Sequence, residues 1–419
     1  MLQHHPLKVI IIGAGTGGLC LAQALKASGI AVEVFERDRT PTDRLQGYRL
    51  SINAQGSRAL RSCLPEALFA KFARGAANAS QSVTFLDHRM SPLLGLDLTR
   101  SAHDSTDREW PVSRTALRRV LLEGLDSIVQ FGKTCVAFDA STDGQVAARF
   151  EDGSSALGTV LVGADGASSR LRSQLLPHAK RIETGIVAVS GKFTLDGAAR
   201  AGVPDPIMRG PTLVLGPRGC FMFANAVLYD RQEHLGRDGG HEEDYVMWGF
   251  SAHRDELGFA APPDSVGDAE ARARVLELMG DWNPDLRGLV EKADLATMST
   301  FAVKTSVPIS PWATRNVTLL GDALHNMTPF RGIGANTALR DAQSLHQMLV
   351  SVSRGEQALL PALARYERGM IDYGFQAVRD SLKDMGRFYA KSVLARGFTK
   401  TMFRAVDRLP RLKSAFLGR

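Results

Sequence analysis

A glycine-rich segment near the start of the chain constrains the fold more than any other feature. Residues 13–18 are Gly-Ala-Gly-Thr-Gly-Gly, and they follow the continuous apolar run Val9–Ile12. Apolar residues then recur at helical spacing from 19 to 28, Gly29 is placed to end that helix, and residues 31–35 suit a second strand. A buried strand, a glycine turn, a helix and another strand within about 30 residues predict a βαβ unit.

The spacing of these glycines is that of a dinucleotide-binding turn. Gly13 permits a tight turn, Gly15 lets a pyrophosphate approach the backbone, and Gly18 allows the helix to pack closely on the strand. Glu36 ends the second strand, where its carboxylate can accept both ribose hydroxyls of an adenosine. Because an acid there disfavours a 2′-phosphate, the unit predicts FAD or NAD. We count the adjacent Arg37 among the cofactor-binding candidates.

Two later segments place polar residues directly after short apolar runs, at residues 163–172 and 321–336. In order and separation, the glycine turn and these segments resemble the flavoprotein aromatic hydroxylases, the class A FAD-dependent monooxygenases with the para-hydroxybenzoate hydroxylase fold. The first segment matches at Asp165, Gly166, Ser169 and Arg172. The second matches at Gly321, Asp322, Ala323, His325, Pro329, Gly332, Gly334 and Asn336. The resemblance extends from about residue 8 to residue 341.

The resemblance implies FAD as the cofactor, NADH or NADPH as the electron donor, and O2 and a small organic molecule as substrates. It places Asp322 on a ribityl hydroxyl and implies that Asp165 and Arg114 also help to hold the cofactor. For Asp165, a purely structural pair with an arginine is an open alternative. Gly47 and Arg49 lie where members of the family approach the flavin ring.

The second segment also has an interpretation from residue type. Gly334 and Ala335 leave room for close approach, and a helix expected from Asn336 would direct its N–H groups at negative charge on the flavin. The resemblance implies that the flavin carries the chemistry, through a C4a-hydroperoxyflavin that hydroxylates or epoxidises an aromatic or polycyclic substrate. We therefore assign no catalytic side chain and no metal site. Pro329 and Phe330, with Arg49, are the pocket candidates.

Strand-like runs separated by Gly and Pro, from about 186 to 259, predict a second, mostly antiparallel domain. Alternation along one of its strands would put three side chains on one face: Phe221, Phe223 and Asn225. Met222 would lie on the other face. Substrate contact and core packing are equally compatible with this pattern. Some family members hold a phenolate with an arginine near 189–193, where this chain offers only Lys192.

Together these features predict an α/β fold. It comprises a Rossmann-like FAD-binding domain with a GxGxxG βαβ unit, an inserted, mostly antiparallel β-sheet substrate domain, and C-terminal helices. We expect the FAD-binding domain to include residues 1–183, some of whose strands could join the second domain, and 286–360. The substrate domain would be 184–285, and the C-terminal helices 361–419.

Composition limits the kinds of partner and cellular compartment that we expect for this chain. The net charge is +7, with many Lys and Arg in 383–419, which leaves room for a weak membrane contact there but predicts no nucleic-acid partner. Four scattered cysteines without a CxxC predict no disulfide framework and fit a cytoplasmic protein. No signal peptide or transmembrane segment is expected. An FAD-dependent reductase or another non-oxygenating flavoprotein of the same fold is the alternative function. Substrate, nicotinamide preference and oligomeric state stay open.

Overall fold

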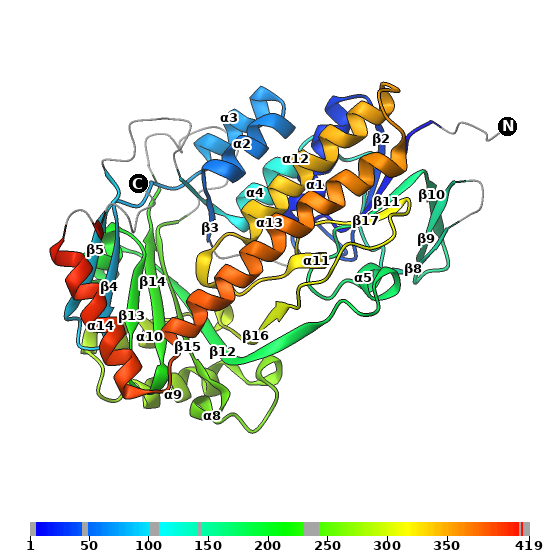
Figure 1. Ribbon diagram of the computed structural model, residues 1–419. Coiled ribbons are helices and arrows are strands. Elements are labelled where there is room, and N and C mark those ends of the chain that lie inside the picture. Colours follow the sequence, from blue (N-terminus) through cyan, green and yellow to red (C-terminus); the bar gives the residue numbers. More distant parts are fainter. Residues whose placement is uncertain are drawn as a thin grey trace. The chain divides into compact units, whose positions relative to one another are not determined.

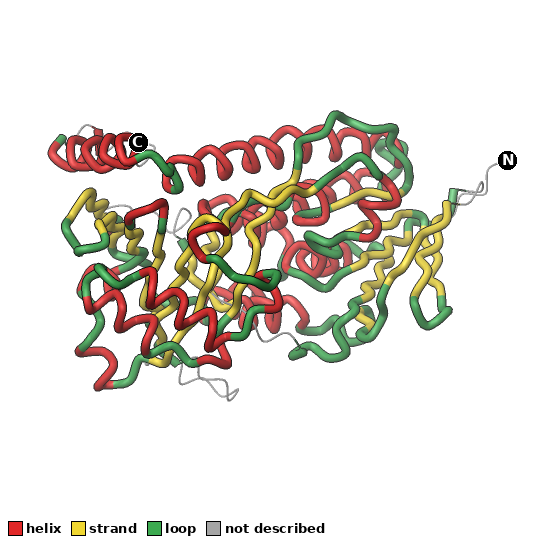
Figure 2. The backbone as a smooth tube through the Cα atoms, turned by 90° about the horizontal axis from the view of Figure 1, so that it is seen from below, coloured by secondary structure: helices red, strands yellow, loops and turns green. Residues whose placement is uncertain are grey.

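The computed structural model describes residues 6–43, 49–99, 109–140, 144–229, 243–409 and 412–413 (Figures 1 and 2). The chain divides into two compact units. Unit 1 comprises Met1–Ala76, Val112–Ile182 and Lys304–Leu382. Unit 2 comprises Ala77–Pro111, Glu183–Val303 and Lys383–Arg419.

Unit 1 is built on a parallel sheet of five strands in the order β17-β11-β1-β2-β7. The strands are β1 (Lys8–Ile12), β2 (Ala31–Phe35), β7 (Val129–Gln130), β11 (Val160–Gly163) and β17 (Val317–Leu319). The central strands are almost wholly buried, which explains their continuous β-branched and aliphatic sequence. This sheet confirms the predicted βαβ unit.

Two helices pack closely beside this sheet. These are α1 (Thr16–Ala27) and α12 (Gly334–Ser353), which lie side by side in Figure 1. A Cβ atom at Gly17 would lie 2.3 Å from Leu320 Cδ2 and 3.2 Å from Ala338 Cβ, so only glycine permits this approach. The other helices of unit 1 are α2 (Ala54–Cys63), α3 (Glu66–Arg74), α4 (Arg114–Leu122), α5 (Arg170–Leu175) and α11 (Asp322–His325). Two smaller sheets are formed by β8 (Cys135–Ala140), β9 (Val146–Phe150) and β10 (Ser155–Gly158), and by β3 (Arg49–Ile52) with β6 (Trp110–Ser113).

Strand β3 and the start of α2 occupy residues 49–55. Residues 54–74 contain two helices, α2 and α3, because Pro65 restricts the preceding Leu64 to an extended conformation. Helix α12 begins at Gly334, two residues before the expected Asn336.

Unit 2 contains most of a seven-stranded sheet with the order β16-β12-β15-β14-β13-β4-β5. Its strands are β4 (Ser82–Asp87), β5 (Pro92–Asp97), β12 (Arg181–Thr194), β13 (Thr212–Leu215), β14 (Phe221–Val227), β15 (Tyr245–His253) and β16 (Ser299–Ser306). The pairs β12–β15, β15–β14, β14–β13 and β4–β5 are antiparallel, whereas β13 and β4 are parallel. The prediction of a mostly antiparallel sheet is thus confirmed.

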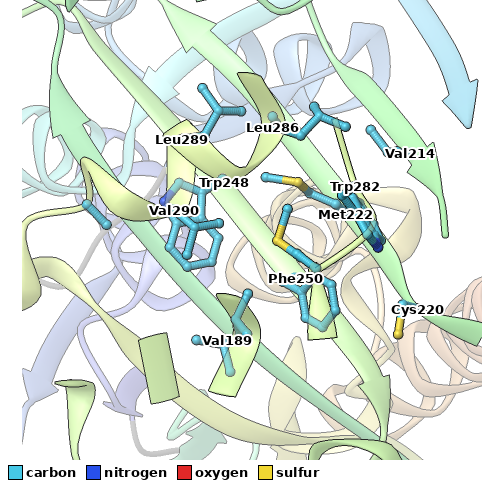
Figure 3. Packing of buried hydrophobic residues seen from close by; sticks show 14 of the residues in the cluster. Val189, Val214, Cys220, Met222, Trp248, Phe250, Trp282, Leu286, Leu289 and Val290 are labelled. Atoms are coloured by element: carbon cyan, nitrogen blue, oxygen red, sulfur yellow. The ribbon is translucent and has the colours of Figure 1, made fainter. Parts of the chain in front are cut away.

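Helices pack on one face of this sheet and form a hydrophobic core with it. Trp248, Phe250 and Met222 project from the strands toward Leu286 and Leu289 of α10 (Pro284–Glu291), as Figure 3 shows. The other helices of unit 2 are α6 (Gly197–Ala201), α7 (Asp205–Arg209), α8 (Arg254–Leu257), α9 (Asp268–Leu278) and α14 (Val393–Arg408). Strand alternation explains this core, since Met222 and its neighbours at even positions face the helices.

The boundaries of the two units fall at other positions than the expected domain boundaries. Residues 77–111 and 383–419 join unit 2, and the first part of α13 (Leu359–Phe388) joins unit 1. Long-range contacts account for both: Tyr366 of α13 donates a hydrogen bond to the carbonyl of Leu319 in β17 (2.9 Å), whereas α14 packs on β5. Assigning cofactor or substrate roles to whole domains stays a prediction.

Candidate FAD site

The polar segments of unit 1 converge on one edge of its parallel sheet. Ile12 is level with Gly163 and Phe35 in the strand register, and Gly163 is level with Leu319. The glycine turn, Glu36, the Asp165 loop and the Asp322 loop therefore all leave the sheet at the carboxyl ends of neighbouring strands. Such an edge is where open α/β sheets bind their ligands.

The glycine turn has the geometry that close approach of a phosphate requires. Gly13 has a φ of +110°, and a Cβ there would lie 2.3 Å from the carbonyl oxygen of Ala164. A Cβ at Gly18 would lie 2.2 Å from the carbonyl oxygen of Gly13. At Gly15, by contrast, a Cβ would meet nothing within 4 Å. Gly13 and Gly18 are therefore needed for the fold, whereas Gly15 keeps open space in front of the N-terminus of α1.

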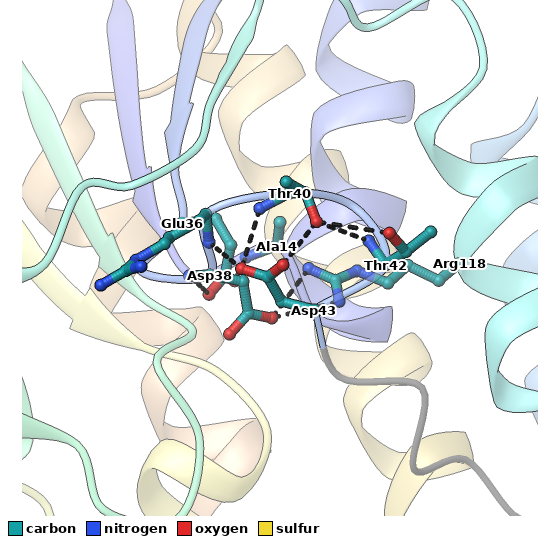
Figure 4. Close-up of polar contacts among 8 residues, drawn as sticks. Ala14, Glu36, Asp38, Thr40, Thr42, Asp43 and Arg118 are labelled. Carbon is teal, nitrogen blue, oxygen red and sulfur yellow. Dashed lines mark hydrogen bonds and ion pairs between the residues drawn. The ribbon is translucent and has the colours of Figure 1, made fainter.

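Glu36 is held against the turn by two backbone groups (Figure 4). Its Oε2 accepts a hydrogen bond from Ala14 N (2.7 Å), and its Oε1 accepts one from Asp38 N (3.0 Å). Each carboxylate oxygen can accept a second bond, so the group remains able to bind ribose hydroxyls. The neighbouring Arg37 is exposed.

An ion pair next to Glu36 was not foreseen from the sequence. Arg118 of α4 lies 3.2 Å from Asp38 Oδ2, and both side chains are largely buried. This pair ties the chain after β2 to α4. Arg114 starts the same helix one turn earlier, after the N-cap Ser113, whose Oγ accepts from Ala116 N (3.2 Å). Arg114 itself is exposed.

The Asp165 loop uses its polar side chains mainly to start α5. Asp165 Oδ2 accepts from Arg170 N (2.9 Å), and Ser169 Oγ accepts from Arg172 N (2.8 Å). Arg172 does not complete the alternative structural Asp–Arg pair; its Nη1 donates to the carbonyls of Ala167 (3.0 Å) and Ala323 (2.8 Å). It therefore fastens the Asp165 loop to the Asp322 loop. Burial raises the pKa of Asp165, against hydrogen bonds that lower it.

Asp322 is the exposed acid of this sheet edge. It follows Gly321, which has a φ of +65°, and its Oδ1 lies 3.9 Å from the position of a Cβ at Gly334. Burial lowers the pKa of Arg181, and the nearby Asp322 carboxylate opposes that shift. Asp322 thus stands directly in front of the N-terminus of α12, where its carboxylate can accept a ligand hydroxyl.

The N-terminus of α12 is built to receive negative charge. Its first residues are Gly334 and Ala335, and no side chain among the described residues caps this helix end. The N–H groups of a first helical turn have no partner within the helix. Asn336 has another role: its Oδ1 accepts from Asn53 N (2.9 Å), and its Nδ2 donates to the carbonyl of Ser51 (2.8 Å). The Asn336 side chain therefore joins β3 and α2 to α12.

A buried carboxylate positions the Asp322 loop, and sequence reasoning missed it. Asp341 Oδ2 accepts from Gly321 N (2.8 Å) and lies 2.7 Å from His325 Nε2, while Tyr373 Oη donates to Oδ1 (2.6 Å). Burial alone would lower the pKa of His325, but the Asp341 carboxylate raises it overall. His325 therefore has a structural role in this network. An acid at a core position of an apolar helix face was the available signal.

The remaining candidates are the residues expected near the flavin ring. Arg49 is half-buried on β3, Pro329 is exposed, and Phe330 is half-buried in the 3-10 turn Pro329–Arg331. Gly47 lies outside the described residues. Within the described ranges, no group of three His, Cys, Asp or Glu side chains is placed to hold a metal ion. In the same part of the chain, no helix combines the length and apolar character needed to cross a membrane.

In unit 2, the sheet face opposite the helical core carries a mixed set of side chains. Strand register brings Lys192, Met247 and Asn225 into one row across three strands. Asn225 is 1% exposed, and its Oδ1 has no hydrogen-bond partner among the described residues. Phe223 is half-buried in the next row, whereas Phe221 on the same face is buried against Phe388 (centroids 5.2 Å apart). The predicted face alternation is confirmed.

A family described as an FAD binding domain matches residues 6–381 of this chain. The chain belongs to this FAD binding domain family. Its membership confirms the resemblance drawn from the sequence motifs, and FAD is the ligand that the geometry of unit 1 fits. Open space at Gly15, an acid at the end of β2 and an uncapped helix behind Asp322 each suit one part of that dinucleotide.

Comparison with individual proteins gives the scale of the similarity. A dual O-methyltransferase/FAD-dependent monooxygenase of Phaeosphaeria nodorum is 32% identical over 394 residues, which are 85% of this chain and 42% of that protein. The chain thus spans less than half of that relative's length. A Photorhabdus luminescens protein, proposed to be an FAD-containing monooxygenase, is 32% identical with a TM-score of 0.80, covering 91% of this chain and 98% of that one. Klebsiella pneumoniae HpxO, solved with FAD and uric acid, is 25% identical with a TM-score of 0.79, covering 97% of this chain and 94% of HpxO.

Proposed function

We propose that this chain is an FAD-dependent monooxygenase. It would take electrons from NADH or NADPH and insert one oxygen atom of O2 into a small aromatic or polycyclic molecule, by hydroxylation or epoxidation. The observation that carries the proposal is the second loop of unit 1, where exposed Asp322 stands in front of the uncapped α12. A dehydrogenase that binds NAD at a glycine turn does not need this second loop.

Different residues of unit 1 would hold different parts of FAD. The N–H groups at the start of α1, over Gly15, suit the pyrophosphate, and Glu36 suits the adenosine ribose. Asp322 suits a ribityl hydroxyl. When bound, FAD supplies the hydride acceptor and the centre that activates O2.

The part of the chain nearest the chemistry is the N-terminus of α12. Its unpaired N–H groups and positive dipole end stabilise negative charge on a ligand that lies in front of Gly334 and Ala335. Asp341 keeps the preceding loop in place through Gly321 N. Because these groups are fixed before a ligand binds, little reorganisation is required when charge develops. Pro329, Phe330 and Arg49 remain the proposed lining of the oxygen-transfer pocket.

For the organic substrate, we propose the sheet face of unit 2 that lies opposite its helical core. Asn225 offers an unsatisfied carbonyl oxygen that suits an N–H or O–H of the substrate, and leaving such a buried group unpaired costs about 1–3 kcal/mol. Lys192, whose Nζ lies 5.1 Å above the Tyr245 ring, suits an anionic oxygen. Half-buried Phe223 offers an apolar surface for a ring. The uric acid bound by HpxO supports a small ring compound as the class of substrate.

The cysteines support a reducing compartment such as the cytoplasm. All four, Cys20, Cys63, Cys135 and Cys220, are buried free thiols. Burial also raises the pKa of Cys135 and Cys220 to about 11, so neither is a reactive thiolate near neutral pH.

The test follows the electrons and the oxygen separately. The FAD-loaded protein is mixed anaerobically with NADH or NADPH, with and without a panel of phenolic and polycyclic compounds, and flavin bleaching is recorded. Isotopically labelled O2 is then admitted, and the products are analysed by mass spectrometry. Ligand-stimulated reduction followed by labelled oxygen in the product supports a monooxygenase. Reduction of an organic acceptor without incorporation of the label would instead establish a reductase.

A further inference from the structure

The outer face of α14 carries apolar side chains that are unusually exposed. Leu394 is 85% exposed, Phe398 73% and Met402 38%, and they recur every fourth residue along the helix. Six of the twelve exposed large hydrophobic residues in the described chain lie between Val393 and Leu412. Isolated exposed apolar residues are ordinary, but a contiguous patch marks an interaction surface.

The opposite face of α14 is already used by unit 2. Phe403 is buried and packs on Phe85 of β4, with ring centroids 4.8 Å apart. Asp407 Oδ1 accepts a hydrogen bond from Gly95 N of β5 (3.0 Å). Because residues four apart share a helix face, Leu394, Phe398 and Met402 form one stripe that points away from this contact. Figure 1 shows α14 lying along β4 and β5.

Positive charge surrounds this stripe. Residues 383–419 contain ten Lys or Arg and two Asp, a net charge of +8, whereas the whole chain carries +7. Arg404 and Arg408 are exposed on α14 and, at 100° per residue, flank the stripe along one side. Ion pairs in this region include Arg387–Asp384 (3.3 Å), Lys391–Asp255 (3.5 Å), Arg404–Asp87 (3.9 Å) and Lys413–Asp407 (2.7 Å). Such exposed pairs are weak, so they leave the cations able to bind other anions.

We propose that the outer face of α14 docks on a membrane surface that contains anionic lipids, with the helix parallel to the membrane plane. Leu394 and Phe398 would enter the boundary between headgroups and acyl chains, and Arg404 and Arg408 would lie near lipid phosphates. A second copy of the chain fits this face less well, because it would bring two basic segments together. The proposal is independent of the chemistry assigned to unit 1.

The test uses the full FAD-loaded chain and flotation with phosphatidylcholine vesicles, with and without phosphatidylglycerol. Binding is expected only to the anionic vesicles, and added salt should weaken it. The double variant Leu394→Glu/Phe398→Glu should bind about tenfold more weakly or worse, because two apolar anchors are lost and negative charge is added. Leu157→Glu is the matched control, since Leu157 is also exposed (54%) but lies on β10 of unit 1.

Circular dichroism and FAD content establish that each variant is folded. Absence of binding to anionic vesicles at low salt would overturn the proposal, as would unchanged binding of the double variant. A dimer in size-exclusion chromatography that the same double variant converts to a monomer would also overturn it and assign the stripe to a second copy of the chain.

Discussion

Units 1 and 2 encode their candidate sites in different ways. In unit 1 the polar residues sit in short contiguous segments directly after strands, as at Gly13–Gly18 and at Gly321–Asp322. In unit 2 the corresponding side chains, such as Lys192 and Asn225, come from different strands and become neighbours only through sheet register. Phosphates are bound largely by backbone groups at a strand end, whereas an organic substrate is recognised by side chains across a sheet. The first kind of site is therefore local in sequence, and the second is not.

Both units contain buried polar groups that lack a hydrogen-bond partner among the described residues. In unit 1, the carboxylates of Glu36 and Asp341 accept backbone N–H groups, but Asp165 Oδ1 has no partner in the described part of the chain. In unit 2, Asn225 Oδ1 has none there either. The units therefore do not differ in this respect, and each offers a buried oxygen for a ligand to satisfy.

The largest expected effect separates the stability of unit 2 from cofactor binding. Trp248 is wholly buried in the unit 2 core, so Trp248→Ala should lower the free energy of unfolding by about 3–5 kcal/mol. FAD affinity of the protein that remains folded should be unchanged. Urea unfolding followed by circular dichroism measures the first quantity, and FAD fluorescence titration the second. Trp248→Phe is the control and should cost less. A weakened FAD affinity in a folded Trp248→Ala protein would break the distinction between the units.

A smaller effect concerns Glu367, a buried acid of unit 1. Burial raises the pKa of Glu367 to about 7, against a hydrogen bond from Thr314 that lowers it. The folded state therefore holds this proton more tightly than the unfolded chain, so the contribution to stability is present at low pH and is lost as the pH rises toward about 7. Glu367→Gln should be more stable than the parent at pH 8 by about 1–3 kcal/mol.

Thermal unfolding of Glu367→Gln and of the parent across pH 5–8 measures this difference. Glu356→Gln, at an exposed site, should leave the parent profile unchanged. A Glu367→Gln protein whose stability follows the parent curve at every pH would show that the buried carboxyl does not titrate in this range.

The next prediction tests whether the glycine turn binds the FAD pyrophosphate. A Cβ at Gly15 meets no protein atom within 4 Å, so Gly15→Val should fold normally and yet obstruct the pyrophosphate. We expect FAD to bind about 10- to 100-fold more weakly, the range for overpacking a close contact. Gly369→Val is the control, because Gly369 in α13 has the same open surroundings without a proposed ligand. Equal FAD affinity of the two variants would refute the assignment of this turn.

The smallest effect is expected at the second loop. Asp322→Ala removes an exposed acceptor, so FAD affinity should fall about tenfold while the melting temperature of the apoprotein stays the same. Dialysis against buffer followed by the visible spectrum measures retention. Asp372→Ala, another exposed acid of unit 1, should retain FAD like the parent. Full retention of FAD by the Asp322→Ala protein would contradict the proposed contact between this loop and FAD.

Sequence reasoning succeeded where function and fold share a short segment. The glycine turn, Glu36 and the Asp322 loop could be predicted because strand, loop and helix start lie within a few residues of one another. Asp341 was missed although it lies only 20 residues after Gly321, because it acts from inside α12 and belongs to none of the loop motifs. The Arg118–Asp38 pair could not be predicted, because its two residues are 80 positions apart on different elements. The inclusion of α14 in unit 2 has the same cause, since Phe403 finds its partners on strands more than 300 residues earlier.

The carboxyl edge of the parallel sheet in unit 1 is where we propose that FAD binds. We would first measure the flavin content of the purified chain, by releasing the cofactor with acid and titrating the apoprotein with FAD by fluorescence quenching. We expect one FAD bound per chain, with NAD unable to displace it. A folded chain that binds no FAD, or that binds NAD in its place, would show that this edge is not an FAD site.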